Sequence, residues 1–226
     1  MKTVTDVAIV LVCGALLFTL LFGVADRRSA VSSADPDPIV IDPGHGGADG
    51  GATAADGTEE KTLNLAVALP LRDLLTVMGY PVVMTRTDDT MLHTEGSTLR
   101  ERKVSDMRNR LALVNTAALT VSIHQNKFPQ TQYWGTQVFY SANTEESRVL
   151  AESVRSCVVD WLQPDNKREL KRGTEDVYLL HRATRPMILV ECGFLSNASD
   201  LSKLQEAAYR QQLAFAVAVG TMKYIG

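Results

Sequence analysis

Beyond residue 38 the chain alternates short apolar runs with longer amphipathic segments, and this alternation strongly limits the folds available to it. Runs typical of strands occur at Ile39–Asp42, Pro81–Thr85, Leu119–Ile123, Gly135–Tyr140, Asp176–Leu180 and Met187–Val190. Segments with helical spacing occur at Lys61–Met78, Leu99–Thr116, Glu145–Leu162 and Leu201–Tyr224. Strands that alternate with helices form parallel sheets covered on both faces. We therefore predict a single α/β domain with a twisted, mainly parallel sheet of about six strands and helices on both faces.

The first 25 residues are expected to direct export rather than to join the fold. The stretch Val7–Ala25 is apolar, carries no charge and is flanked by basic residues. About 20 apolar residues span a bilayer as a helix, so this stretch suits a membrane anchor or a cleaved signal peptide. A buried core helix is less favoured, because the stretch has no polar face. Residues 26–38, rich in Ser, Asp and Pro, are expected to be a linker, and residues 39–226 the catalytic domain.

Charge and cysteine content exclude two classes of protein. The formal net charge is −3, without the basic footprint that nucleic-acid binding requires, so we expect no nucleic-acid partner. The three cysteines are irregularly spaced, and one of them lies in the apolar N-terminal stretch. They therefore suit neither a disulfide framework nor a thiolate metal cluster, and packing must stabilise the fold.

Four residues with ligand or acid–base chemistry follow the predicted strands or begin the first helix. His45 follows the first strand in a glycine-rich loop, His124 follows the third strand, and Glu191 follows the last. Glu60 lies near the start of the helix after the first strand. In open α/β sheets, ligands bind at the edge where the carboxyl ends of the strands meet. We therefore expect these four side chains to gather at one site.

Other polar residues have simpler interpretations. His93 lies in a polar loop, and His181 follows a predicted strand in a stretch that resembles an exposed loop, so both are expected to be solvated or hydrogen-bonded without a catalytic role. Cys192 is adjacent to Glu191 in the same strand. Neighbouring strand residues point to opposite sides, so we interpret Cys192 as structural.

The acidic residues need a separate comparison of alternatives. Glu59 and Glu60 could simply favour the positive end of a helix dipole, and for either residue alone this interpretation would be preferred. Glu191 is harder to explain in this way. A carboxylate that directly follows four apolar strand residues is destabilising unless it is paired, so a functional role is favoured.

Two imidazoles and one carboxylate form a donor set that suits a catalytic zinc ion. Such an ion takes three protein ligands, leaves a position for water and lowers the pKa of that water to about 7. A second carboxylate can then transfer the proton to the leaving group. We expect His45, Glu60 and His124 to bind one catalytic zinc ion and Glu191 to be the acid–base catalyst. The HExxH, GxSxG, P-loop and dinucleotide-binding motifs are absent from the sequence.

Four collinear motifs resemble those of the zinc-dependent N-acetylmuramoyl-L-alanine amidases, from Ile39 to the C-terminus. The motifs are Asp42–Gly47 with Asp49–Ala52, Glu60-Lys61, Ser122–Asn126 and Val190–Asn197. The resemblance implies the same three zinc ligands and the same catalytic glutamate. It also implies that the substrate is peptidoglycan, glycan strands with stem peptides, cut at the amide between the lactyl group of muramic acid and L-alanine. The neighbouring Glu59 leaves a one-residue ambiguity in the ligand.

Three further stretches look like the spore-cortex amidases of endospore-forming bacteria: Arg100–Arg110, Trp134–Ser141 and Val177–Leu180. In that subgroup the enzyme removes stem peptides so that muramic-δ-lactam, a mark recognised by germination enzymes, can form. Some clostridial relatives need a partner lipoprotein to hold zinc. The resemblance therefore implies a role in cortex maturation and an activating lipoprotein as a candidate partner. It also implies export, anchored or secreted, to the intermembrane space of the forespore.

Two more residues are expected to contact the substrate. Arg86 follows the second predicted strand, where its planar guanidinium could bind a carboxylate; a salt bridge with Asp88 or Asp89 is an equally favoured alternative. Asn126 belongs to the same motif as His124. Two rival functions stay open at this point: another cell-wall zinc hydrolase, such as a carboxypeptidase or deacylase, and a catalytically inactive peptidoglycan-binding module.

Overall fold

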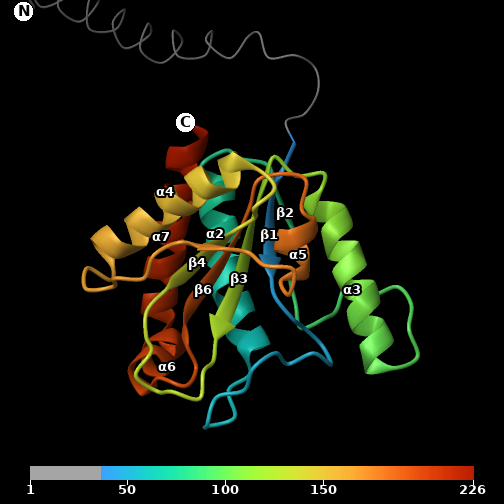
Figure 1. Cartoon of the computed structure of the whole chain (residues 1–226), viewed down its shortest axis with the longest axis horizontal. Helices are drawn as coiled ribbons and strands as arrows, with labels where there is room; N and C mark the ends of the chain where they lie inside the picture. Colours follow the sequence, from blue (N-terminus) through green and yellow to red (C-terminus); the bar gives the residue numbers. More distant parts are fainter. Residues whose placement is uncertain (1–36) are drawn as a thin grey trace, which may run out of the picture. The chain divides into compact units, whose positions relative to one another are not determined.

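Six strands form one sheet in the computed structural model, which describes residues 37–226 (Figure 1). The strands are β1 (Ile39–Pro43), β2 (Val82–Met84), β3 (Leu119–Asn126), β4 (Gln137–Tyr140), β5 (Lys171–Arg172) and β6 (Met187–Phe194). The helices are α2 (Glu60–Val77), α3 (Leu99–Val114), α4 (Glu145–Trp161), α5 (Tyr178–Arg182), α6 (Ala198–Gln205) and α7 (Ala207–Ile225). The predicted export segment and all but the end of the predicted linker lie outside the described residues.

The strands follow the spatial order β2-β1-β3-β6-β4-β5. The pairs between β2, β1, β3 and β6 are parallel, β4 runs antiparallel to β6, and β5 is parallel to β4. This arrangement confirms the predicted α/β fold with a mainly parallel sheet. In the described part of the chain, no helix is long and apolar enough to cross a membrane.

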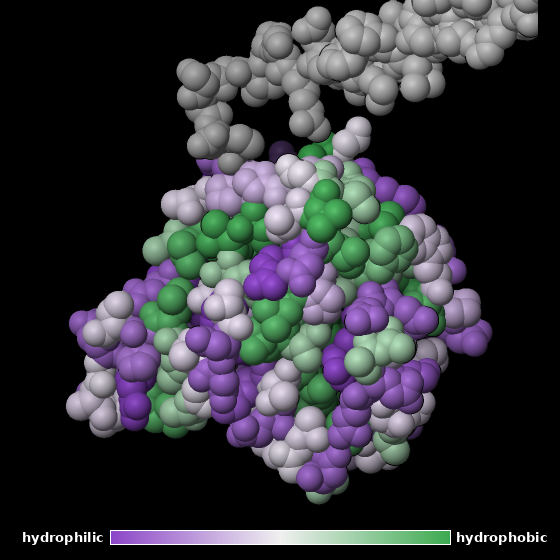
Figure 2. Space-filling view, turned by 180° about the vertical axis from the view of Figure 1, so that it is seen from behind, coloured by the Kyte–Doolittle hydropathy of each residue, from purple (hydrophilic) through white to green (hydrophobic). Residues whose placement is uncertain are grey.

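Helices cover the two faces of the sheet unequally. A large apolar core packs α2, α4 and α7 against one face of the sheet. A smaller core lies under α3 and α5 and contains six buried residues, among them Val114, Leu180 and Met187. In Figure 1, α3 stands apart from the group formed by α2, α4 and α7. Figure 2 shows the molecule from behind, relative to Figure 1. On this face apolar residues lie in small patches between polar ones.

The predicted strand at Asp176–Leu180 is wrong, because this segment forms a turn followed by the short helix α5. Its backbone bonds are local: the amide of His181 donates to the carbonyl of Val177 at 2.9 Å. A short apolar run buries its side chains equally well as a strand or as one helical turn, and periodicity alone does not separate the two. His181 therefore lies on a helix rather than in a loop after a strand, and it is exposed.

Two other details differ from the sequence expectation. The sixth strand is β5, only two exposed residues long, which pairs with β4 instead of forming from an apolar run. The predicted helix Leu201–Tyr224 is two helices, α6 and α7. They are separated at Glu206, whose φ of −82° and ψ of 124° are extended rather than helical.

One buried arginine ties α3 to the end of β1. The Arg110 side chain is fully buried, and it donates to Asp42 Oδ1 at 2.6 Å and to Asp106 Oδ2 at 2.7 Å. It also donates to the backbone carbonyls of Pro43 and His45 at 2.9 and 2.7 Å. Burial by itself would raise the pKa of Asp42, but the charge of Arg110 and the hydrogen bonds from Ser122 and Thr85 lower it to about 2. The guanidinium thus joins a helix, a strand and the loop that follows the strand.

Replacement of Arg110 by methionine is expected to lower the free energy of unfolding by about 3–5 kcal/mol, because it leaves buried carboxylates without their partner. Arg108→Met is the matched control on the same helix, since the Arg108 side chain is 65% exposed. The control should change the free energy of unfolding by no more than about 0.5 kcal/mol. Chemical denaturation followed by circular dichroism measures both, and equal losses in the two variants would contradict the role assigned to Arg110.

Candidate active site

The polar residues of the predicted site share one face of the sheet because strand residues alternate. In β6, Met187 and Leu189 belong to the smaller core, so Glu191 points to the same face, under α3 and α5. In β3, Ile123 belongs to the large core, so His124 points away from it. His124 and Glu191 are register partners in the parallel pair. Both strands are longer than predicted, so these two residues lie within the strands and not after them.

His45 lies on a tight loop after β1 in a constrained conformation. Its φ is 62°, a left-handed value that few non-glycine residues adopt. The imidazole Nδ1 lies 2.9 Å from Asp49 Oδ2, and Nε2 lies 3.3 Å from Glu60 Oε2. Burial lowers the pKa of His45, but its hydrogen bonds with Asp49 and Glu60 more than offset this and raise it to about 9. The orientation of the ring is therefore set by two carboxylates.

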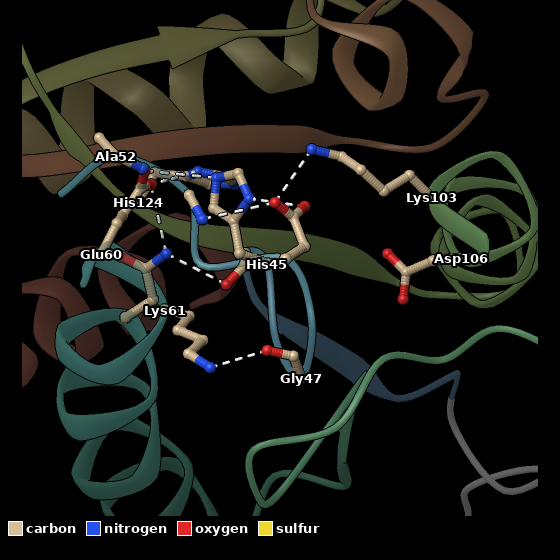
Figure 3. A network of polar contacts seen from close by, with 12 residues as sticks. His45, Gly47, Ala52, Glu60, Lys61, Lys103, Asp106 and His124 are labelled. Carbon is tan, nitrogen blue, oxygen red and sulfur yellow. Dashed lines mark hydrogen bonds and ion pairs between the residues drawn. The ribbon is translucent and has the colours of Figure 1, made fainter. Parts of the chain in front are cut away.

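Glu60, the first residue of α2, lies between the two histidines (Figure 3). Its Oε1 lies 2.9 Å from His124 Nδ1 and accepts a hydrogen bond from the backbone amide of Gln125 at 3.1 Å. Its Oε2 accepts from the amide of Ala52 at 2.9 Å. Burial raises the pKa of Glu60, but the hydrogen bonds and charges of the two histidines hold it well below its usual range. The carboxylate is thus fixed as an anion.

Glu59 does not share this environment. Its side chain is 45% exposed and lies 3.4 Å from Lys61 Nζ. Of the two neighbouring acids, Glu60 is therefore the one that meets the imidazoles.

Two glycines make room for the cluster. A Cβ atom at Gly44 would collide with the ring of His124. One at Gly51, whose φ is 69°, would lie 2.6 Å from Glu60 Oε2 and 2.7 Å from the ring of His45. The glycine-rich pattern around His45 thus lets backbone pack directly against the polar side chains.

The three clustered side chains have the donor chemistry of a metal site. One ligand atom from each of His45, Glu60 and His124 lies within 4.8 Å of the others. The two imidazole rings are 5.1 Å apart at an interplanar angle of 75°. Asp49 binds the other ring nitrogen of His45, as carboxylates do for metal-ligating histidines. Two imidazoles and a carboxylate fit a catalytic zinc ion.

Glu191 lies beside this cluster with an unsatisfied carboxylate. Its Oε2 is buried and has no hydrogen-bond partner among residues 37–226. Burial raises the pKa of Glu191 to about 7; the charge of His124 opposes the rise and that of Glu60 adds to it. A carboxyl group with a pKa near neutrality can both accept and release a proton.

A cavity of about 440 Å³ opens onto these groups. His124 and Glu191 line it from the sheet, His45 lines it from the loop after β1, and Lys103 and Tyr178 line it from α3 and α5. Sheet and helices therefore enclose a space in which a substrate could reach all three side chains.

Arg86 is occupied by backbone groups. The residue is only 5% exposed. Its guanidinium donates to the carbonyl oxygens of Pro43, Gly44, Lys61 and Asp88. Because these contacts occupy the guanidinium of Arg86, they argue against the prediction that it binds a substrate carboxylate. They also differ from the alternative prediction, a salt bridge between Arg86 and the side chain of Asp88 or Asp89. They hold the loop after β1 against the start of α2.

Asn126 ends β3, two residues beyond His124 and after a shift in the register with β6. Its carbonyl oxygen accepts a hydrogen bond from the amide of Leu195 at 2.8 Å. Contact between its side chain and the substrate stays a prediction.

Sequence reasoning missed Asp49 and Lys103 as parts of the site. Lys103 reaches from α3 and donates to Asp49 Oδ1 at 2.9 Å, while Oδ2 of the same carboxylate contacts His45. The only sequence signal for Asp49 is its position four residues after His45, inside the glycine-rich loop. Nothing in the polar pattern of α3 distinguishes Lys103 from its charged neighbours.

Comparison with known proteins identifies the family to which this chain is similar. The family model described as N-acetylmuramoyl-L-alanine amidase matches residues 39–223. The germination-specific N-acetylmuramoyl-L-alanine amidase of Bacillus subtilis (strain 168) is 36% identical over 195 residues, which cover 82% of this chain and 78% of that protein. The sporulation-specific N-acetylmuramoyl-L-alanine amidase of the same organism is 32% identical over 183 residues, covering 78% of this chain and 63% of that protein.

Among solved structures, the CwlD amidase from Clostridioides difficile, in complex with the GerS lipoprotein, has a TM-score of 0.80 and 36% identity. The match covers 84% of this chain and 98% of that chain. Together with the family match, these similarities show that the chain belongs to the N-acetylmuramoyl-L-alanine amidase family.

Proposed function

We propose that the chain is a zinc-dependent amidase that hydrolyses the amide between the lactyl group of muramic acid and the L-alanine of the stem peptide. The observation that carries this proposal is the approach of His45, Glu60 and His124 to within 4.8 Å of one another. Glu191 lines the same cavity as His45 and His124. The family match supports the choice of this amide bond.

In this proposal each residue has a distinct task. His45, Glu60 and His124 hold the zinc ion, which when bound acidifies water and polarises the scissile carbonyl. Glu191 accepts a proton from the attacking water on its carboxylate and donates it to the leaving nitrogen of L-alanine. Its pKa near 7 suits both directions of transfer. Asp49 keeps the ring of His45 in a fixed orientation through the hydrogen bond to Nδ1.

We place this activity in the maturation of the spore cortex, where removal of stem peptides allows muramic-δ-lactam to form. Similarity to germination-specific and sporulation-specific amidases supports this setting. A lipoprotein is the expected protein partner, since the similar CwlD amidase was solved in complex with one. The apolar segment before residue 26 would export the chain, as an anchored or secreted protein, to the intermembrane space of the forespore.

Glu191→Gln is expected to lower the cleavage rate by roughly 10²–10⁴-fold, because the amide side chain cannot transfer the proton. The bound zinc should be nearly unchanged, since Glu191 is not among the three clustered ligands. Mass spectrometry of digested peptidoglycan measures cleavage, and elemental analysis measures zinc. Wild-type products should be intact stem peptides and peptide-free glycan. Loss of terminal D-alanine would indicate a carboxypeptidase instead, and full activity in the variant would refute the role of Glu191.

Glu60→Gln is expected to weaken zinc binding by at least roughly tenfold, because even groups that only support metal ligands contribute that much. Glu59→Gln is the matched control, with the same chemical change one residue away on an exposed side chain. Competition with a chromophoric chelator gives both affinities. If the two variants bound zinc equally well, Glu60 would not be a ligand.

A further inference from the structure

A second cavity, of about 640 Å³, adjoins the catalytic cavity along α3. Lys103, Met107 and Tyr178 line both cavities, so the two are neighbours that share a wall. The second cavity continues outward past Arg100 and Arg108. We call it the α3 groove. It gives a path along the surface that begins at the groups proposed to cut the substrate.

The α3 groove combines apolar and positively charged side chains. Leu99, Val104 and Tyr178 are 42%, 45% and 38% exposed there. Its charged lining residues are all basic: Arg100, Lys103 and Arg108. Because the whole chain has a formal net charge of −3, this is a local enrichment in positive charge and does not reflect the composition.

The positive charges are available to a ligand to different degrees. Lys103 is bonded to Asp49 and so belongs to the support of His45. Arg108 lies 3.7 Å from Glu95, with both side chains largely exposed, and such surface pairs contribute little. Arg100 has no ion pair with any residue in the range 37–226. The two arginines can therefore turn toward an incoming anion.

We propose that the α3 groove binds the stem peptide of the substrate and recognises its carboxylate groups through Arg100 and Arg108. This inference rests on the proposed function, because the peptide is attached to the amide bond that is cut. A stem peptide has small alanine side chains and several free carboxylates, whereas the glycan offers mainly neutral hydroxyl groups. Arginine binds carboxylates through paired hydrogen bonds, and the apolar floor suits methyl groups.

The decisive variant is Arg100→Gln/Arg108→Gln, which removes both charges and leaves Lys103 and the catalytic residues unchanged. The matched control is Arg72→Gln/Arg148→Gln, which removes one half-buried and one exposed charge from α2 and α4, the helices of the opposite layer. Three substrates are compared: a muropeptide with free stem carboxylates, the same muropeptide with its carboxylates amidated, and N-acetylmuramoyl-L-alanine amide.

For the first substrate, the groove variant should raise KM roughly tenfold with kcat nearly unchanged, as expected for the loss of two exposed ion pairs. The KM values for the amidated muropeptide and for the minimal substrate should not change, and the control variant should behave as wild type. A general structural defect would instead affect all three substrates. Equal KM values of wild type and groove variant for the free carboxylate substrate would overturn the proposal.

A binding measurement separates this proposal from the proposed function. Calorimetry with the free stem peptide, without any cleavage, should show salt-dependent binding to the wild type that the groove variant loses. The wild type could cleave none of the substrates and still show salt-dependent peptide binding that the groove variant loses. In that case the proposed function would be wrong, but peptide binding by the α3 groove would be supported. If only stimulation by a lipoprotein partner were lost, the groove would be a protein-docking surface and the peptide proposal would be wrong.

Discussion

The buried ion pair between Arg110 and Asp42 is the interaction on which the site depends. Asp42 is buried near the end of β1 and accepts hydrogen bonds from Ser122 on β3 and from Thr85 after β2. Arg110 adds helix α3 and the carbonyl oxygen of His45 to the same network. A charged group in such surroundings is stable only with its partners in place. The position of His45 is therefore determined by three strands and one helix together, rather than by its loop alone.

The rest of the site follows from strand alternation and from close packing of backbone. Because β3 and β6 are parallel neighbours in register, His124 and Glu191 lie side by side on the face opposite to the large core. Gly44 lets β1 come close enough for the ring of His124 to pack against its end. Glu60 then approaches from the first turn of α2 and accepts hydrogen bonds from backbone amides as well as contacting the imidazoles. Few of these positions could change independently of the others.

Much of this could be predicted from the sequence, and the failures have physical causes. Periodicity reveals the strands, and the rule that carboxyl ends of parallel strands meet at one edge brings His45, His124 and Glu191 together. The same reasoning fails for Asp176–Leu180, since one short apolar run suits either a strand or a helical turn. It also gives no sign of β5, whose two residues owe their pairing to their neighbours. Above all, the polar pattern of α3 does not show that Arg110, rather than Arg108, is buried, because burial there depends on Asp42, 68 positions away.

The two apolar cores differ in size, and this difference affects which part of the molecule opens locally first. Free energies of local opening range from near zero to the full stability of a domain, and segments with few buried apolar contacts open first. The layer of α3 and α5 buries fewer apolar side chains than the layer of α2, α4 and α7, so it is the less stable of the two. The buried ion pairs of Arg110 fix the second half of α3. We therefore expect local opening to begin in the layer of α3 and α5, which forms one wall of the catalytic cavity, and not in the strands that carry His124 and Glu191.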